Sequence, residues 1–451
     1  MNRAILAASP LLLVASCVKE SKVEKPNIVM LFVDDLGWAD LGYQNPIFET
    51  PNINKLKAEG LYFERNYVPT ATSSPSRATL LTGKQALRCG FVRHIYEPKG
   101  EETDQQRSEF QTLASDPGNM KSRAWLQHEE ITYAERLKEF GYYNYFIGKW
   151  HLGHEAYYPT TQGFDASFGS NEHGHPSNYY NVPFFKTQNP FGEMGKDAYL
   201  TEVLTDGAVD FIQSYDKEQP FLLNFWYYTV HSPHFGKKEY VEKYMAAGMD
   251  KPLANYAAMV HSLDDSVGRI LAALKESGKA DNTMVIFVSD QGGSFPNGVL
   301  RGGKKGGDTL AEGGSRVPMI IYYPEAKGMG MTYSKPVSTT DIYPTLIELA
   351  SGRECQDTQI DGVSLLPIIN GGEQEDRTIY LFRSYEDQNS AIIEGDWKLI
   401  KYRSGKRELY NIREDISERN NLAGIDVARA DDMLHRLLEW EAEATPQYLL
   451  H

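Results

Sequence analysis

Acidic side chains follow two apolar segments of this chain. Asp34 and Asp35 come directly after residues 28–33 (IVMLFV), and a second apolar run ends just ahead of Asp290 and Gln291. Carboxylate and amide oxygens are the hard ligands that Ca²⁺ and Mg²⁺ prefer. Acids and glycines are also ordinary turn residues after strands, so either pair alone could be structural. Two such pairs on one sheet favour a site for a divalent cation.

Two further apolar runs end in basic and imidazole side chains. Lys149 and His151 belong to the glycine-flanked segment 148–153 (GKWHLG), and His231 lies in a loop that follows the run 221–227. A lysine and a histidine in a loop are usually just hydrated. Beside a metal site, however, a cation can bind an anion and an imidazole can donate a proton. Together the four strand ends indicate a site for a charged, tetrahedral substrate.

Ser73 is a candidate nucleophile within residues 71–84 (ATSSPSRATLLTGK). Pro75 is typical of the first turn of a helix, so we expect Ser73 to lie just outside the N-terminus of that helix. Backbone N–H groups and the helix dipole favour negative charge at that point. Arg77 follows one turn later. On these local features alone, a simple helix-capping role for Ser73 is the stronger alternative.

The segments that carry these residues alternate between strands and helices. Strands are expected near residues 28–33, 142–147, 221–227, 284–288 and 319–322, and helices near 51–59, 132–141 and 256–278. This alternation predicts an α/β fold with a large, mostly parallel or mixed sheet and helices on both faces. Ligands of such sheets bind at the carboxyl ends of the strands, where the candidate residues lie.

The pattern changes near residue 370, after which no further βα alternation follows. Short strands are expected at residues 380–382, 390–393 and 397–402, and a helix at about 428–441. We therefore divide the chain into a main domain, residues 27–370, and a C-terminal α+β subdomain, residues 371–451. The subdomain is predicted to be a small antiparallel sheet with a terminal helix.

The first 17 residues (MNRAILAASPLLLVASC) are typical of an export signal. Arg3 precedes an apolar stretch that is too short to span a bilayer. The small residues before Cys17 resemble a bacterial lipobox, in which the cysteine is lipidated and becomes the first residue of the mature protein. An ordinary signal peptide with a coincidental cysteine is the alternative. With residues 18–26 as a charged linker, we expect an exported bacterial lipoprotein, periplasmic or at the cell surface and anchored through Cys17.

Composition and charge narrow the function classes. The 451 residues are 41% hydrophobic and 24% charged, which excludes a disordered or fibrous chain. The net charge of −15 argues against a nucleic-acid partner, whose binding requires basic patches. Three cysteines are too few for a disulfide framework. Cys89 and Cys355 could pair after export or remain two separate thiols.

A family resemblance emerges from the segment Ser73-x-Pro75-Ser76-Arg77, which is followed by Leu81-Thr82-Gly83. This segment resembles the signature of the type I sulfatases of the alkaline phosphatase superfamily. Other segments resemble further blocks of that family in the same order: 26–37, 148–153, 231–233, 312–318, 341–345, 361–365, 395–399 and 408–411. The resemblance thus covers nearly the whole mature chain. It implies an alkaline phosphatase-like fold and hydrolysis of a sulfate ester. Because an exported lipoprotein fits a bacterium that feeds on sulfated glycans, we expect the ester to be on a glycan-derived sugar.

The resemblance implies a modified nucleophile and one metal ion. A maturation enzyme would oxidise Ser73 to formylglycine, whose hydrate attacks sulfur and then expels sulfate through its second hydroxyl. One divalent cation, expected to be Ca²⁺, would be bound by Asp34, Asp35, Asp290, Gln291 and the modified Ser73. The family often has Asn where Gln291 stands, so the longer side chain leaves the ligand geometry open.

The resemblance also implies roles for the basic residues. Arg77 would hold the oxygens of the nucleophile, Lys149 would neutralise sulfate, and His151 would support the formylglycine hydroxyl. His231 would be the general acid for the leaving alcohol. A second active-site lysine is expected a few residues before a Glu-Gly-Gly segment. Lys304 and Lys305 are the candidates, with Lys304 preferred, although both lie farther from that segment than in relatives.

Substrate contacts and rival functions are less defined. His173, His175 and Asn178 crowd one loop and could bind a sugar ring or be structural. The segment from about Arg93 to Gln127 is another candidate pocket wall. One rival is a phosphatase or phosphodiesterase of the same superfamily that uses unmodified Ser73; the single-metal ligand set and the Pro75-Ser76-Arg77 context argue against it. The other rival is an inactive lipoprotein that binds sulfated glycans, against which the complete set of catalytic residue types argues.

Overall fold

The structure is a computed structural model that describes residues 25–96, 108–112, 118–180, 195, 197–305 and 307–450. The expected signal segment and Cys17 lie outside the described residues. Among the helices of the described part, none combines the length and apolar character that crossing a membrane requires. Cys89 and Cys355 are both free, and Cys89 is buried.

An eight-stranded mixed sheet forms the centre of the main domain, in the order β11-β2-β10-β9-β1-β8-β6-β7. Its strands are β1 (Asn27–Val33), β2 (Leu61–Phe63), β6 (Tyr143–Gly148), β7 (Ala166–Phe168), β8 (Phe221–Trp226), β9 (Thr283–Ser289), β10 (Met319–Tyr322) and β11 (Thr332–Tyr333). The five strands from β9 to β7 are parallel, whereas β10 runs antiparallel to β9. The predicted α/β sheet is therefore confirmed. Central strand β1 is apolar and buried from Ile28 to Val33, as expected of a strand that is covered on both faces.

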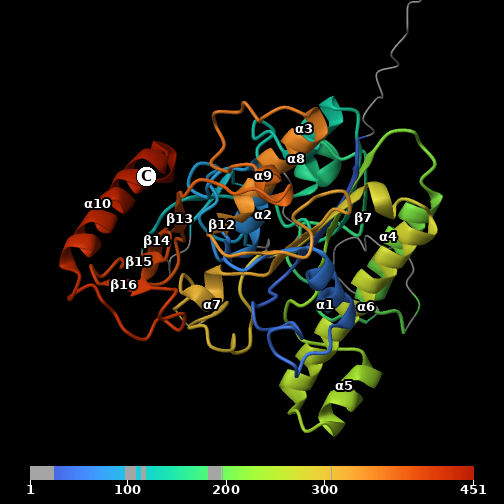
Figure 1. Cartoon of the computed structure of the whole chain (residues 1–451), viewed down its shortest axis with the longest axis horizontal. Coiled ribbons are helices and arrows are strands. Elements are labelled where there is room, and N and C mark those ends of the chain that lie inside the picture. The colour runs from blue at the N-terminus through green and yellow to red at the C-terminus, as the bar shows by residue number, and fades with distance from the viewer. Residues whose placement is uncertain are drawn as a thin grey trace, which may run out of the picture.

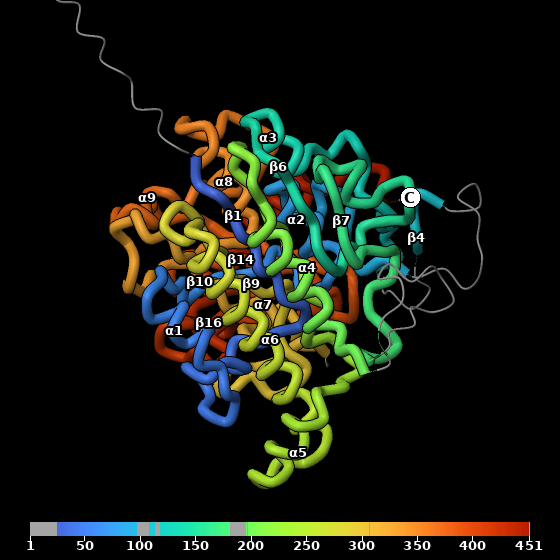
Figure 2. The backbone as a smooth tube through the Cα atoms, turned by 90° about the vertical axis from the view of Figure 1, so that its right-hand side faces the viewer, coloured from blue at the N-terminus to red at the C-terminus, as the bar shows by residue number. Residues whose placement is uncertain are grey.

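Helices cover both faces of this sheet (Figure 1). The helices of one face are α1 (Pro51–Glu59), α4 (Leu200–Ser214) and α6 (Lys251–Glu276). The helices of the other face are α2 (Ser73–Thr82), α3 (Tyr133–Glu139), α8 (Ile342–Ser351) and α9 (Leu366–Ile369). Strand β1 joins both cores, since Leu31 packs into the first and Phe32 into the second. Helix α5 (Lys238–Ala246) packs on α6 and projects from one end of the molecule (Figure 2).

Short elements complete the main domain. Strands β3 (Asn66–Tyr67) and β12 (Val337–Ser338) form a parallel pair, and β4 (Phe110–Gln111) and β5 (Ser122–Arg123) an antiparallel pair. Helix α7 (Glu312–Ser315) is a single turn. The 3₁₀ segments are η2 (Glu155–Tyr157), η3 (Pro159–Thr161), η4 (Ala280–Asn282), η5 (Thr339–Asp341) and, near the C-terminus, η6 (Gln447–Leu449).

The C-terminal part is a four-stranded antiparallel meander covered by one helix. Its strands are β13 (Thr378–Phe382), β14 (Gln388–Glu394), β15 (Trp397–Tyr402) and β16 (Arg407–Asn411), and the helix is α10 (Val427–Ala444). Leu437 of α10 packs with Ile392 and Leu399 of the sheet. The predicted antiparallel sheet with a terminal helix is confirmed, and β16 is an additional strand.

A buried ion network connects the meander to the main domain. Lys398 of β15 lies 2.8 Å from Glu312 of α7 and 3.3 Å from Glu418, and all three side chains are fully buried. Tyr67 of β3 donates a hydrogen bond of 2.9 Å to Glu312. The charges of the network compensate one another only while both parts of the chain are in place.

Replacing Lys398 with methionine should lower the free energy of unfolding by up to about 3–5 kcal/mol, because two buried carboxylates would lose their closest cation and keep only the more distant Arg316 and Arg301. Chemical denaturation measures the effect. Lys401→Met is the matched control: Lys401 lies in the same strand and pairs with Glu441, but both side chains of that pair are partly exposed. The control should cost at most about 1 kcal/mol. Equal losses in the two variants would contradict a special role for the buried network.

Candidate active site

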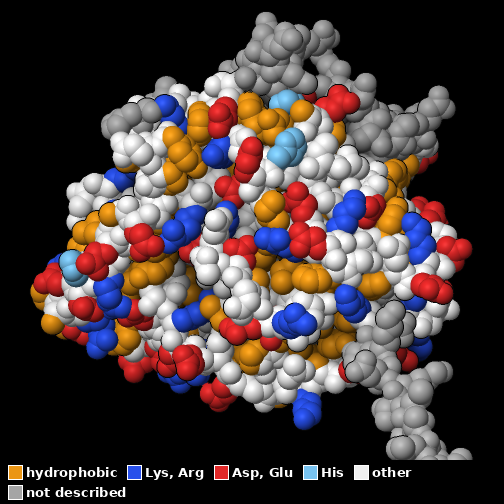
Figure 3. All heavy atoms as spheres, turned by 90° about the horizontal axis from the view of Figure 1, so that it is seen from above, with side chains coloured by type: hydrophobic (Ala, Val, Ile, Leu, Met, Phe, Trp, Pro, Cys, Tyr) orange, Lys and Arg blue, Asp and Glu red, His pale blue; other side chains and the backbone are white. Residues whose placement is uncertain are grey.

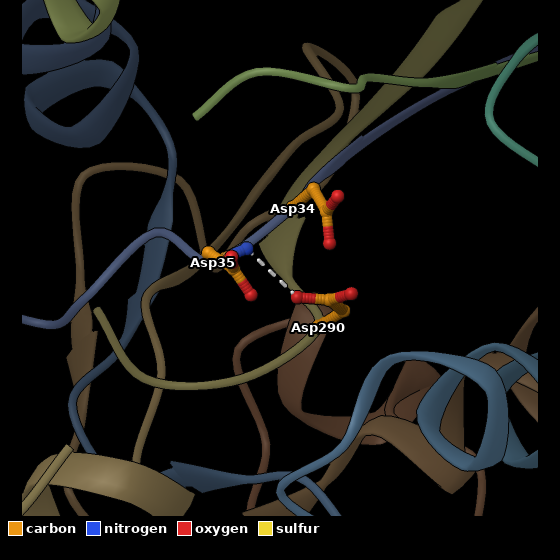
Figure 4. A group of neighbouring side chains, drawn as sticks. All are labelled: Asp34, Asp35 and Asp290. Atoms are coloured by element: carbon orange, nitrogen blue, oxygen red, sulfur yellow. Dashed lines mark hydrogen bonds between the residues drawn. The ribbon is translucent and has the colours of Figure 1, made fainter. Parts of the chain in front are cut away.

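The ends of two neighbouring strands place three carboxylates together. Val33 of β1 pairs with Ser289 of β9, so Asp34, Asp35 and Asp290 leave the sheet side by side. Their oxygens come within 4.8 Å of one another, and all three residues are fully buried. The backbone N–H of Asp35 donates a 2.9 Å hydrogen bond to Asp290 (Figure 4). The structure thus brings together the acids that the sequence placed at adjacent strand ends.

Ser73 faces this acidic cluster from the first residue of α2. We expected it just outside the helix, but Thr72 is the extended residue before the first turn, so the helix starts one residue earlier. The Ser73 hydroxyl lies 2.9 Å from Asp34 Oδ1 and 2.8 Å from Asp290 Oδ2, and its single proton serves either acceptor. Lys149 donates to the same oxygen at 3.1 Å. Two carboxylates and the ammonium group of Lys149 therefore hold the Ser73 hydroxyl, and Ser73 does not cap the helix.

Two buried cations compensate the acids. Lys149 forms an ion pair of 2.6 Å with Asp34. The Arg77 guanidinium lies 3.1 Å from Asp290 and 3.3 Å from Asp34, and it also donates to the carbonyl oxygen of Lys149. The rings of Phe32 and Trp226, each with its centroid 5.2 Å from Arg77 Cζ, flank the guanidinium. Packing and ion pairs together fix Arg77 beside the nucleophile.

The remaining candidate ligand and the lysine pair take separate positions. Gln291 donates its amide N–H to Asp35 at 2.7 Å, so its oxygen becomes a ligand only after a half-turn of the amide. Lys304 pairs with Asp35. Lys305 is exposed and lines the cavity described below. Of the two lysines, Lys304 is the one in direct contact with the acidic cluster.

The histidines differ in their contacts. His231 Nε2 lies 3.7 Å from Asp35, and its Nδ1 is 2.5 Å from the carbonyl oxygen of Ser232, which fixes Nδ1 as the protonated nitrogen. His175 stacks on His231 with ring centroids 5.0 Å apart. His151 Nε2 lies 3.3 Å from the carbonyl oxygen of Ile95. His231 is thus the imidazole nearest to the acids.

Burial and neighbouring charge set the protonation of the site. Burial, assisted by repulsion from Asp34, raises the pKa of Asp290 to about 7. Burial also acts to raise the pKa of Asp34, but the charges of Lys149 and Arg77 hold it well below its usual value. Burial lowers the pKa of His151 and of His231 well below the usual value, and a lysine adds to the effect in each case: Lys149 for His151 and Lys304 for His231. A bound anion would raise both histidine pKa values by offsetting the charges of these two lysines.

A cavity of about 380 Å³ opens over this cluster. Among the candidate residues it is lined by Ser73, Lys149, His151, His175, His231, Gln291, Lys304 and Lys305. Of the three expected sugar contacts, only His175 is among the described lining residues. His173 is buried, and the side chain of Asn178 accepts the backbone N–H of Tyr180.

One wall of this cavity was identified only in part from the sequence. It is lined by His94, Ile95 and Tyr96 and, from the turn between β13 and β14, by Arg383, Tyr385 and Glu386. The rings of His94 and Tyr385 lie 5.7 Å apart. These two segments are almost 300 residues apart in the chain, and no local pattern in either signals that they meet. The prediction that segment 93–127 forms a pocket wall is confirmed for His94, Ile95 and Tyr96, whereas the part formed by residues 383–386 was not predicted.

The sequence model of the Sulfatase family matches residues 26–352.

The chain belongs to the sulfatase family.

A second model, described as the C-terminal part of N-sulphoglucosamine sulphohydrolase, matches residues 309–443 of this sulfatase. The chain is 33% identical to N-acetylgalactosamine-6-sulfatase of Mus musculus over 88% of its own length and 76% of the relative. It is 29% identical to human arylsulfatase A over 85% and 75%. The solved structure of Ps i-CgsB in complex with k-i-k-neocarrahexaose has a TM-score of 0.77 and 31% identity, with 94% of each chain covered.

These similarities place the protein among the formylglycine-dependent sulfatases of the alkaline phosphatase superfamily, as a sulfuric ester hydrolase. Sulfatases use a metal ion, and the residues here fit one. Asp34, Asp35 and Asp290 supply converging hard oxygen donors, and burial together with repulsion from Asp34 raises the pKa of Asp290, a cost that a bound cation would relieve.

The surface of this sulfatase contrasts with its site. On the face shown in Figure 3, basic and acidic side chains are interspersed. At the site, by contrast, Arg77, Lys149 and Lys304 meet around one cluster. Local charge rather than net charge decides anion binding, so a net charge of −15 is compatible with a sulfated substrate.

Proposed function

We propose that this sulfatase removes sulfate from a glycan-derived sugar with the help of formylglycine at Ser73 and one Ca²⁺ ion. The observation that carries the proposal is the position of the Ser73 side chain, in contact with Asp34, Asp290 and Lys149 on the wall of the cavity. Formylglycine would supply a hydroxyl nucleophile and a second hydroxyl for sulfate release. The metal ion would act as a Lewis acid on a sulfate oxygen.

The side chains of the protein supply the remaining functions. Lys149 and Lys304 carry positive charge at the place where the sulfate oxygens gain charge in the transition state. Arg77 holds the nucleophile in place. His231 keeps its proton on Nδ1 through Ser232, so its Nε2 is the nitrogen that can take up a proton and pass it to the leaving alcohol.

A sulfated carbohydrate is the substrate class that the comparisons favour. One relative is named for N-acetylgalactosamine 6-sulfate, and one solved structure contains a neocarrahexaose. The aromatic and polar wall formed by His94, Tyr96 and Tyr385 suits a sugar ring, which presents both an apolar face and hydroxyl groups.

The decisive experiment has two parts. A panel of monosaccharides and disaccharides, each sulfated at one defined position, is incubated with protein made alongside a maturation enzyme, and sulfate release is measured. The tryptic peptide that contains residue 73 is weighed in parallel. We expect sulfate release from at least one sugar and a peptide that is two hydrogens lighter than the unmodified form. Active protein that carries only unmodified Ser73 would favour the phosphatase or phosphodiesterase alternative.

We also propose that the protein is exported and anchored through lipid on Cys17, in the periplasm or at the cell surface of a bacterium. The short apolar segment that ends in Val14-Ala15-Ser16-Cys17 supports this proposal. Cys17→Ser should move the protein from the membrane fraction to the soluble fraction of the host. An unchanged distribution would rule out the lipid anchor.

A further inference from the structure

Arg383 is a buried cation on the wall of the cavity that opens over the acidic cluster. It follows β13, lines the cavity and is 5% exposed. Its Nη1 donates to Thr309 and lies 3.4 Å from Glu386. Its Nε is buried without a hydrogen-bond partner, and within the described part of the chain no partner exists for Nη2 either. Two donors of the guanidinium are therefore unused.

The charge of Arg383 is also weakly compensated. The carboxylate that faces it belongs to Glu386, whose side chain is 37% exposed. The ion pair between the two residues is long, at 3.4 Å. By comparison, Lys149 has a buried partner in Asp34 at 2.6 Å, and Arg77 has two fully buried carboxylates at 3.1 and 3.3 Å. Burial lowers the pKa of Arg383, which shows that Glu386 does not offset the cost of burying the charge.

The surroundings of Arg383 belong to a substrate site. The face of Tyr385 lies against the guanidinium, with 4.8 Å between Arg383 Cζ and the ring centroid. Ser73 and Lys149 line the same cavity, whose volume of about 380 Å³ is in the range of small-molecule sites. A ligand that presents one anionic group to Lys149 can therefore present a second group to Arg383.

We propose that Arg383 binds a second anionic group, a carboxylate or a further sulfate, of the same sugar substrate. The proposal rests on the proposed function. The planar fork of a guanidinium matches two oxygens of such a group, and Nε and Nη2 are one edge of that fork. Glu386 competes for the same cation and turns toward solvent when the substrate binds. The enzyme would then select sugars that carry two negative charges.

Binding to the full chain with Ser73→Ala tests this without turnover. The probes, in the presence of Ca²⁺, are N-acetylgalactosamine 6-sulfate, its 4,6-disulfate, and a disaccharide of the 6-sulfate with glucuronic acid. Calorimetry should give tighter binding for at least one of the doubly charged probes. Adding Arg383→Gln should weaken binding of that probe by about tenfold or more and change the affinity for the singly charged probe by less than about twofold. Which of the two probes responds distinguishes a second sulfate from a carboxylate.

Glu386→Gln provides a test in the opposite direction, and it holds even if Arg383→Gln fails to fold. Removing the competing carboxylate should tighten binding of the doubly charged probe several-fold. Arg407→Gln, an arginine of β16 paired with the exposed Asp431, is the control and should change nothing. Equal effects of Arg383→Gln on all probes, or no gain with Glu386→Gln, would overturn the proposal. A failure of the proposed function would appear separately, as absence of sulfate release by the unmutated enzyme.

Discussion

Ser73→Ala should reduce sulfate release at least about a thousandfold and leave the fold intact, because alanine cannot be converted to the nucleophile. The loss should appear in kcat, since Lys149 and Lys304 still offer positive charge to the sulfate. Steady-state kinetics on the best sugar of the panel measures it, and thermal unfolding monitors the fold.

Ser74→Ala is the matched control for this variant. Ser74 is the next residue of α2, is equally buried from solvent, and accepts the backbone N–H of Ile95 instead of contacting an acid. Its replacement should change turnover by a few-fold at most. If Ser73→Ala kept more than a few per cent of wild-type turnover, a different group would be the nucleophile.

Calcium should raise the melting temperature of the chelator-treated protein by several degrees and restore its activity. Three buried carboxylates repel one another, and a bound cation removes that repulsion. At a calcium concentration one hundred times Kd, binding would contribute about 2.7 kcal/mol. Differential scanning calorimetry with Ca²⁺, Mg²⁺ and Zn²⁺ in turn identifies the preferred ion.

Asp290→Asn should abolish the calcium-dependent shift and reduce activity by more than about a hundredfold. The variant removes one metal-binding carboxylate that also contacts Ser73 and Arg77. Asp281→Asn, at an exposed position in η4 away from the cluster, should respond to calcium as the wild type does. A normal calcium shift in Asp290→Asn would show that the ion binds elsewhere.

The sequence predicted well which residues lie at the carboxyl ends of the strands in the large sheet, because the sequence signals for them are local. Each apolar run is long enough to identify a buried strand, and site residues follow each run within five residues, as Asp34 and Asp35 follow Val33 and His231 follows Trp226. Pairing of parallel strands then brings these ends together. Even the error at α2 was small, since moving the start of the helix by one residue left Ser73 facing the same acids.

The contact between segment 93–127 and residues 383–386, which completes the wall of the cavity, could not be predicted for the opposite reason. His94 and Tyr385 meet through packing of the main domain against the meander, and neither segment has a motif or a periodicity that reports the contact. The expected sugar contacts His173 and Asn178 were inferred from crowding of polar residues in one loop. The structure instead uses Asn178 to accept a backbone N–H within that loop.

The position of the turn between β13 and β14 keeps the residues that select the sugar apart from those that act on sulfate. The groups that act on sulfur stand on strand ends and α2 of the large sheet, whereas Arg383, Tyr385 and Glu386 stand on a turn of the other sheet. A turn tolerates substitution better than the end of a buried strand. Selectivity for new sugars can therefore change through a few residues of one turn while the sulfate chemistry stays untouched, which makes residues 383–386 the natural site for altering the substrate range by mutagenesis.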